Sequence, residues 1–114
     1  HNELNACARL VLNIHRESMV RSGWSPATRT FEAAGAGACQ ITDAWEGIAD
    51  FFDPGREILV AADGRDVAEY VRTIDEVTAA RIGSAARRRA LRDHTYAQRA
   101  RLLDAILHRA EVTP

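Results

Sequence analysis

The residues best suited to chemistry lie at an expected helix start, in the segment SPATRTFEAAGAG. Ser25 is a good N-cap and Pro26 is a good first helical residue. The backbone N–H groups that point out of such a helix start belong to Ala27, Thr28 and Arg29. Unpaired N–H groups and the positive end of the helix dipole together attract anions, above all phosphate. The sequence therefore predicts a phosphate site at this helix start.

Glu32 stands one turn after Thr28, about 5 to 6 Å further along the same helix face. That offset is comparable to the separation between the phosphates and the ribose of a nucleotide, and a carboxylate can accept hydrogen bonds from two ribose hydroxyls. The small residues that follow would let the helix pack closely on a sheet, with Gly37 as a natural C-cap. The alternative is equally concrete: Glu32 is then a surface glutamate and Ser25 an ordinary cap.

The composition is typical of one small globular domain. The 114 residues are 46% hydrophobic and 27% charged, with a formal net charge of -1, which gives no reason to expect a nucleic acid as the main partner. No repeat, low-complexity tract or linker is visible, so residues 1–114 are expected to form a single domain. All 15 basic residues are arginine, a bias that hints at a GC-rich bacterial genome.

Cys7 and Cys39 lie in apolar sequence and are predicted to be buried, reduced thiols of a cytoplasmic protein. The sequence shows no cluster of metal-ligating residues, so no metal is expected. No run approaches the roughly 20 apolar residues that span a bilayer, and no basic-then-apolar leader precedes the first strand. Because the chain starts at His1 and its only methionine is Met19, we expect a processed chain or a piece of a longer one.

Three short apolar runs are predicted strands: Arg9–Ile14 (RLVLNI), Ala38–Asp43 (ACQITD) and Glu57–Ala62 (EILVAA). Segments with helical spacing alternate with them. The expected fold class is therefore α/β, with a short parallel sheet flanked by helices in a three-layer, Rossmann-like arrangement. Because the helix at Ser25 begins soon after the first strand, its start is expected at the carboxyl edge of the sheet, where ligands of open α/β folds bind.

Two helices are predicted after the third strand. Asp63 can cap the first of them. Its apolar residues recur at i, i+3, i+4 and i+7 and are expected to form one buried stripe: Val67, Tyr70, Val71 and Ile74. The second helix, Asp75–Arg92, is less clearly amphipathic. Its arginine run resembles a phosphate-binding cluster only in isolation and is better explained as a solvated face or a last-turn charge complement: Arg87, Arg88 and Arg89.

A last helix is predicted over about Tyr96–Glu111. Thr95 and Gln98 have the spacing of a capping box at its start. Its apolar face is formed by Tyr96, Ala100, Leu102, Leu103, Ile106, Leu107 and Ala110.

Three segments, taken together, resemble a known family. RTFEAAGAGACQITD, FFDPGREILVAADGRDVAEYV and HTYAQRARLLDAIL are similar to the C-terminal, donor-binding half of group 1 glycosyltransferases of the GT-B fold, particularly the CgeB-like branch. The resemblance runs from about Leu10 to Leu107. It implies transfer of a sugar from a nucleoside diphosphate sugar to an unidentified acceptor, with no cofactor and no divalent metal.

The resemblance also implies roles for single residues. Glu32, the glutamate of the E-A-x-x-x-G pattern, would bind the ribose of the donor. The diphosphate would lie at Ala27, Thr28 and Arg29. Members of the family usually carry another glutamate eight positions before the first, where it attends the sugar or the transition state, and this chain has Trp24 at that position.

Glu17 could take the role of that missing glutamate if the segment SMVRSGW is an insertion. His15, in the same loop, is either an exposed histidine or a residue that meets the sugar. Trp45 follows the second strand, so it faces the carboxyl edge, where it either covers the core or contacts the base. Arg56 is expected to belong to a turn.

The chain taken alone is expected to have no transferase activity, because such enzymes bring donor and acceptor together with a second half, an effect that can contribute about 7 to 11 kcal/mol. An exposed sheet edge at Arg9–Ile14 predicts self-association there or through neighbouring apolar surface. Two other classes stay open. One is a nucleotide- or phosphate-binding module without transferase activity, which Trp24 favours, and the other is a non-catalytic interaction domain that retains the fold.

Overall fold

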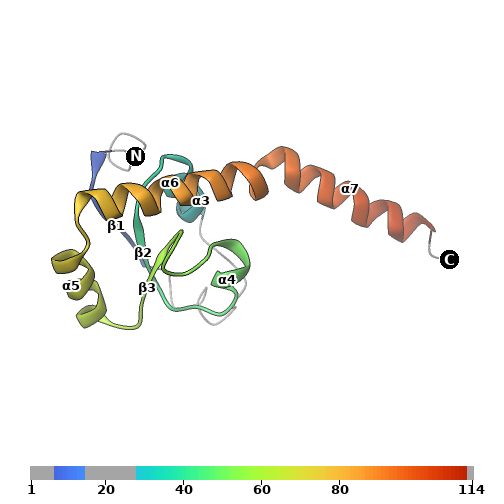
Figure 1. Cartoon of the computed structure of the whole chain (residues 1–114). Coiled ribbons are helices and arrows are strands. Elements are labelled where there is room, and N and C mark those ends of the chain that lie inside the picture. The colour runs from blue at the N-terminus through green and yellow to red at the C-terminus, as the bar shows by residue number, and fades with distance from the viewer. Residues whose placement is uncertain (1–6, 15–27, 113–114) are drawn as a thin grey trace.

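The structure, a computed structural model, describes residues 7–14 and 28–112. It is an α/β arrangement of short parallel strands and helices (Figure 1). The strands of the described ranges are β1 (Val11–Asn13), β2 (Gln40–Asp43) and β3 (Leu59–Ala61). The helices are α3 (Thr28–Gly35), α4 (Ile48–Phe51), α5 (Gly64–Thr73), α6 (Glu76–Asp93) and α7 (Tyr96–Val112). The expected α/β, Rossmann-like fold class is confirmed.

The sheet has the order β1-β2-β3, and both of its strand pairs are parallel. The three strands lie where the apolar runs predicted them, but each is shorter than its run. Arg9, which was predicted to belong to the first strand, lies before β1 and contacts α5 instead. Arg9 donates hydrogen bonds to the carbonyl oxygen of Val71, at 3.1 Å, and to that of Ile74, and it thereby satisfies carbonyl groups at the end of α5.

Side chains of the strands alternate between the two faces of the sheet. Ile41 and Leu59 belong to an apolar cluster with Ile82 of α6 and the partly buried apolar residues of α5. On the opposite face, the Gln40 side chain donates to the backbone carbonyl of Thr30 in α3, at 2.9 Å. Helices therefore cover both faces, as the three-layer expectation requires.

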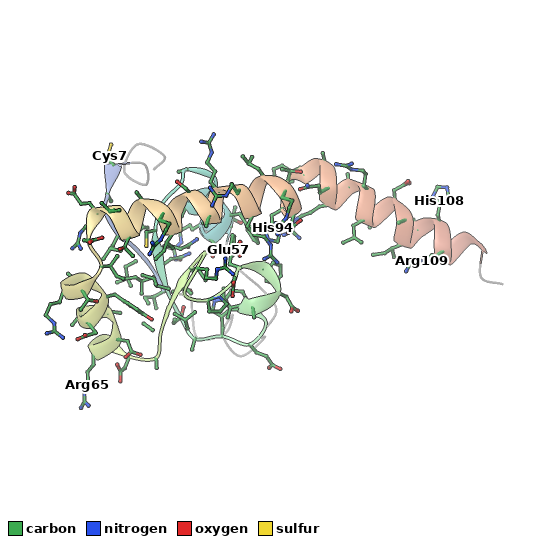
Figure 2. The ribbon with its side chains drawn as sticks, viewed as in Figure 1. Cys7, Glu57, Arg65, His94, His108 and Arg109 are labelled. Carbon is green, nitrogen blue, oxygen red and sulfur yellow. The ribbon has the colours of Figure 1, made fainter. Side chains whose placement is uncertain are left out.

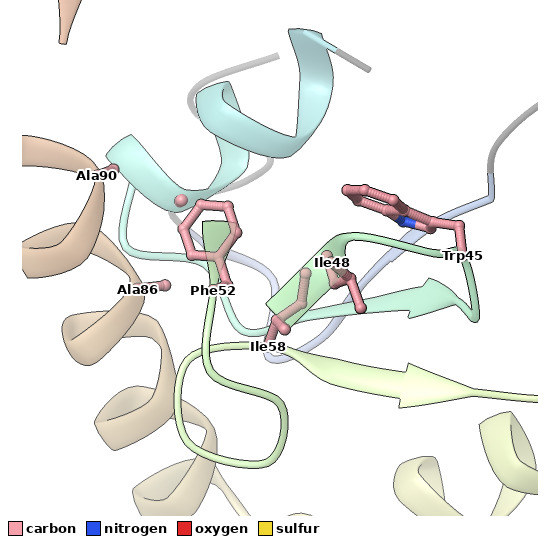
Figure 3. Close-up of a cluster of buried hydrophobic side chains, with 7 residues drawn as sticks. Trp45, Ile48, Phe52, Ile58, Ala86 and Ala90 are labelled. Carbon is pink, nitrogen blue, oxygen red and sulfur yellow. The ribbon is translucent and has the colours of Figure 1, made fainter. Parts of the chain in front are cut away.

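A second apolar cluster is centred on Phe52, which is fully buried. In Figure 3 the Phe52 ring lies beside Ala86 and Ala90 of α6, and the other labelled members are Trp45, Ile48 and Ile58. Burying one aromatic side chain of this size contributes about 1.5 to 3 kcal/mol. This cluster joins α6 to the segment between β2 and β3.

The end of α3 brings it very close to α6. Ala38 N–H donates to Ala33 O and Gly37 N–H donates to Ala34 O, both at 3.0 Å, which is the Schellman pattern. Gly37 has a φ of 77°, so the predicted glycine C-cap is confirmed. A Cβ on Gly83 of α6 would lie 2.0 Å from Gly37 O. Only glycine at position 83 permits this approach.

α5 begins at the predicted cap. The Asp63 carboxylate accepts hydrogen bonds from two amides of the first turn, at 3.0 and 3.1 Å. The predicted buried stripe is partly wrong, because Val71 is 49% exposed, whereas the other three residues pack against the Ile41 cluster. The Tyr70 hydroxyl donates to Val60 O at 2.8 Å. α5 thus contacts the sheet along a strip narrower than the apolar face of its sequence.

α6 confirms the predicted helix and explains its weak pattern. Asp75 caps it by accepting a hydrogen bond from Thr78 N at 2.7 Å, and that bond lowers the pKa of Asp75. The buried face consists mostly of small residues, which give only a weak periodic signal in hydropathy. Its members are Ala79, Ile82, Gly83, Ala86 and Ala90. Small side chains let α6 lie close to its neighbours.

The arginine run on α6 divides into two kinds of residue. Arg87 and Arg88 are exposed, as the solvated-face interpretation predicted. Arg89 departs from that interpretation: its side chain is only 20% exposed and forms ion pairs with Glu57, at 3.1 Å, and Asp93, at 2.7 Å. The reason is its helical position beside the half-buried Ala85 and the buried Ala86, which turns Arg89 toward the loop before β3.

α7 starts with the predicted capping box. Thr95 N–H donates to Gln98 Oε1 at 2.9 Å, and Gln98 N–H donates to Thr95 Oγ1 at 3.3 Å. The helix then projects away from the sheet (Figure 1). Its large aliphatic side chains are 51% to 62% exposed: Leu102, Leu103, Ile106 and Leu107. The described part of the chain does not cover this face.

One prediction about the cysteines is wrong. Cys39 is buried, but Cys7 is exposed, because it precedes β1 and lies outside both apolar clusters. Among the described helices, none combines the length and apolar character that crossing a bilayer requires. Within the same ranges, no three side chains of the metal-ligating types come together as a site.

Candidate functional site

The first turn of α3 lies next to the carboxyl end of β1. Arg29 donates a hydrogen bond to Ile14 O at 3.3 Å, and Thr28 and Arg29 are both exposed. The helix start is therefore at the carboxyl edge of the sheet, as predicted. The other residues predicted for this region lie outside the described ranges: His15, Glu17, Trp24, Ser25, Pro26 and Ala27.

A buried polar layer fixes α3 to the sheet beneath this helix start. Asn13 Nδ2 donates to Thr30 Oγ1 at 3.0 Å and to Gln40 Oε1 at 3.4 Å. All three residues are at most 3% exposed. Buried polar groups are costly unless they are hydrogen-bonded, so these bonds select one position for α3. The first turn of α3 is consequently held in place from below.

Glu32 is exposed and lines a groove of about 480 Å³. One wall of the groove is the outer face of α3, where Thr28, Glu32 and Gly35 follow one another at i, i+4 and i+7. A Cβ on Gly35 would meet no atom within 4 Å. The groove therefore runs along α3 from the helix start to its last turn, with the Glu32 carboxylate in the middle.

The opposite wall comes from the junction between α6 and α7. Its residues are Ala90, Leu91, His94, Thr95, Tyr96 and Arg99. His94 Nε2 lies 2.7 Å from Phe51 O, and the imidazole lies 5.3 Å, centre to centre, from the Phe31 ring of α3. This contact holds the junction against α3, and Figure 2 shows His94 where α6 gives way to α7.

The positively charged side chain of Arg99, at the start of α7, lies on the Phe31 ring. The Arg99 guanidinium carbon is 5.1 Å from the centre of that ring, within the range of a cation–π contact. Arg92 does not line the groove. It is hydrogen-bonded to Asp93 at 2.9 Å, and this bond holds the pKa of Asp93 below its ordinary value. Arg99 is thus the cation at this wall of the groove.

Trp45 is only 6% exposed and belongs to the Phe52 cluster. Its Nε1–H lies 3.4 Å from Thr42 Oγ1 and donates to it. This is the core-covering alternative for Trp45, and a contact with a nucleotide base stays a prediction. Arg56 lies in a turn closed by Gly55, with φ 87°, and pairs with Asp53 at 3.8 Å, as expected.

Sequence reasoning about the helix start missed one wall of the groove. Phe31, His94 and Arg99 surround the predicted Glu32 and Thr28, yet His94 and Arg99 come more than 60 residues later in the chain. The sequence signal for this wall is the segment HTYAQR, in which Thr95 and Gln98 have capping-box spacing and so indicate a helix start. Nothing in its spacing relates it to Glu32.

The comparison with curated proteins and the comparison with solved structures give no match. A protein family described as glycosyl transferase-like matches residues 1–105. The match includes α3, the groove and the start of α7, so the described site lies inside the family region. At this coarse level, the match supports glycosyl transfer. The chain belongs to the glycosyl transferase-like family.

Proposed function

We propose that the chain is the donor-binding part of a GT-B glycosyltransferase of the CgeB-like branch, which transfers a sugar from a nucleoside diphosphate to an acceptor. The observation that carries the proposal is the groove in which Glu32 lies one turn beyond the start of α3. Family membership supports transfer of a sugar. The carboxylate supplies the acceptor atoms that ribose hydroxyls need.

In this proposal the residues act by binding and by electrostatic stabilisation. The amides at the start of α3, with Arg29, hold the diphosphate while negative charge develops on it as the sugar leaves. Glu32 fixes the ribose, and His15 and Glu17 attend the sugar. The chain by itself would bind the donor nucleotide without transferring the sugar.

Titration calorimetry with UDP, GDP and ADP tests this proposal. Glu32→Gln should weaken binding of the preferred nucleotide by about 1 to 3 kcal/mol, the range for hydrogen bonds to a charged group, and leave the melting temperature nearly unchanged. The matched control is Glu69→Gln, an exposed glutamate on α5 that pairs with Arg72. Unchanged affinity in Glu32→Gln would remove this residue from the site.

Arg29→Ala separates diphosphate binding from nucleoside binding. If Arg29 binds the diphosphate, the variant loses affinity for the nucleoside diphosphate and keeps its affinity for the nucleoside. Equal losses of affinity for both ligands would mean that Arg29 only stabilises the fold, through its hydrogen bond to Ile14 O.

A second candidate function is nucleotide binding without transfer, and the specific observation in its favour is Trp24 at the position of the second family glutamate. Tight nucleotide binding by the complete protein together with no transfer or hydrolysis of any nucleotide sugar would support it. No binding of any nucleotide would favour an interaction domain instead.

A further inference from the structure

The groove has two chemically different ends. Because Gly37 contacts Gly83, and Phe31 contacts His94, α3 and α6 run in opposite directions. The last turn of α3 therefore lies beside Ala90 and Leu91, and its first turn lies beside the start of α7. One end of the groove is apolar and open at Gly35, whereas the other carries the Arg99 cation.

Arg99 and Arg29 lie on the two sides of Thr28. In an α-helix, Arg29 follows Thr28 by about 100° and Phe31 lies about 60° away in the other direction. The Arg99 guanidinium rests on Phe31, so the two arginines flank Thr28. No carboxylate of the described residues forms an ion pair with Arg99, and its charge is available to an anion from outside.

We propose that Arg99 is a second diphosphate-binding residue and that the nucleotide lies along α3 with its diphosphate at Thr28 and its base at Gly35. This inference rests on the proposed function and adds the direction of the ligand and a residue from α7. The distances agree with it: Glu32 is about 6 Å along the axis from Thr28 and about 4.5 Å from Gly35, so the ribose lies between phosphate and base.

Each end of the ligand has a suitable environment. A guanidinium binds phosphate oxygens with paired, charge-assisted hydrogen bonds. The base end has the exposed Leu91 side chain, Ala90 and a position without a Cβ, which leaves room for a flat ring against apolar surface. The contact between Arg99 and the Phe31 ring holds the guanidinium over the first turn of α3 before any ligand arrives.

Two variants test the two ends separately. Arg99→Ala should weaken binding of the nucleoside diphosphate by roughly ten- to a hundredfold and leave nucleoside affinity unchanged, with partial recovery in Arg99→Lys. Gly35→Leu should weaken binding of nucleoside and nucleoside diphosphate by similar factors, because the new side chain occupies the space for the base. The matched control is Arg101→Ala, since Arg101 lies on the same helix, is exposed and does not line the groove.

The outcomes distinguish this inference from the function on which it rests. If Glu32→Gln loses affinity while Arg99→Ala keeps full affinity for the diphosphate, the role of Arg99 is wrong and the donor site stands. If Arg99→Ala loses nucleoside and diphosphate affinity equally, Arg99 only shapes the groove. If Gly35→Leu keeps nucleoside affinity, the direction is wrong. If the unaltered protein binds no nucleotide, both the inference and the proposed function fail.

Discussion

Arg89 shows how a residue in a charged run can serve the interior of the fold. Its side chain is 20% exposed and that of its partner Glu57 is 15% exposed. Arg89→Leu leaves Glu57 half-buried without its ion-pair partner, which should lower the free energy of unfolding by about 1 to 3 kcal/mol, less than for a fully buried pair.

Chemical denaturation measures this effect. The matched control is Arg88→Leu, the neighbouring and exposed arginine, which should change the free energy of unfolding by less than about 0.5 kcal/mol. Equal stability of the two variants would contradict the structural role of Arg89.

Cys39 provides a prediction about pH. Burial raises the pKa of its thiol from 9.0 to about 11, and nearby Arg9 opposes the shift. The unfolded thiol loses its proton near pH 9 while the folded thiol keeps it, so ionisation of Cys39 leaves stability unchanged below pH 9 and lowers it as pH rises from 9 toward 11. Denaturation midpoints of the unaltered protein and Cys39→Ala should therefore converge or cross in that window.

Alkylation at pH 8 checks the same difference without unfolding the protein. Cys7 is exposed and Cys39 is buried, so iodoacetamide should modify Cys7 rapidly and reach Cys39 only after denaturation. Rapid labelling of both thiols in the folded protein would show that Cys39 is accessible.

At the scale of elements, the contact between α3 and α6 depends on Gly83. Gly83→Ala places a Cβ 2.0 Å from the backbone oxygen of Gly37. We expect a cost near the upper end of the range for overpacking, about 1 to 3 kcal/mol, because a backbone atom in a constrained turn cannot move aside easily. This outweighs the gain in helix propensity, about 1 kcal/mol.

Thermal unfolding of Gly83→Ala should therefore show a lower midpoint than that of the unaltered chain. Gly64→Ala is the control, because a Cβ on Gly64 meets nothing within 4 Å. A stabilised Gly83→Ala variant would show that α6 can move away from α3 at little cost.

The elements were largely predictable because their signals are local. Short apolar runs indicate the three strands, and the predicted caps at Asp63 and Thr95 lie within three residues of the amides or side chains they bind. Exposure was less predictable. Val71 has the right spacing for a buried stripe but is 49% exposed, and spacing alone contains no information about the packing partner.

The site was predictable on one side only. Glu32 and Thr28 share a helix, so helix geometry was enough to relate them. Their neighbours His94 and Arg99 reach the groove through the length and direction of α6, and that direction depends on a stripe of small residues such as Ala86 with little periodic signal. A tertiary contact of this kind cannot be read from local patterns.

At the scale of the whole molecule, β1 lies at an edge of the sheet that the described residues form; its Leu12 is 55% exposed, and Ile14, the residue after the strand, is 49% exposed. We expect the chain to self-associate through this edge, because unpaired strand groups beside apolar side chains favour pairing with another chain. Leu12→Lys should shift sedimentation toward the monomer.

The apolar face of α7 offers a different route to association, so a second variant is needed. Leu103→Lys changes that face and should leave the association through β1 intact. If Leu103→Lys alone dissociates the chains, they associate through the apolar face of α7 and not through the sheet edge.

The projection of α7 also fixes how the chain scatters X-rays. The radius of gyration is 15.7 Å and the longest dimension is 57 Å, whereas a compact chain of this length has a radius of gyration of about 13 Å. Small-angle scattering from dilute monomer should therefore give a pair-distance distribution with a long tail and a radius near the larger value. A radius near 13 Å would mean that α7 lies against the sheet in solution. The position of the Arg99 guanidinium on the Phe31 ring would then be wrong.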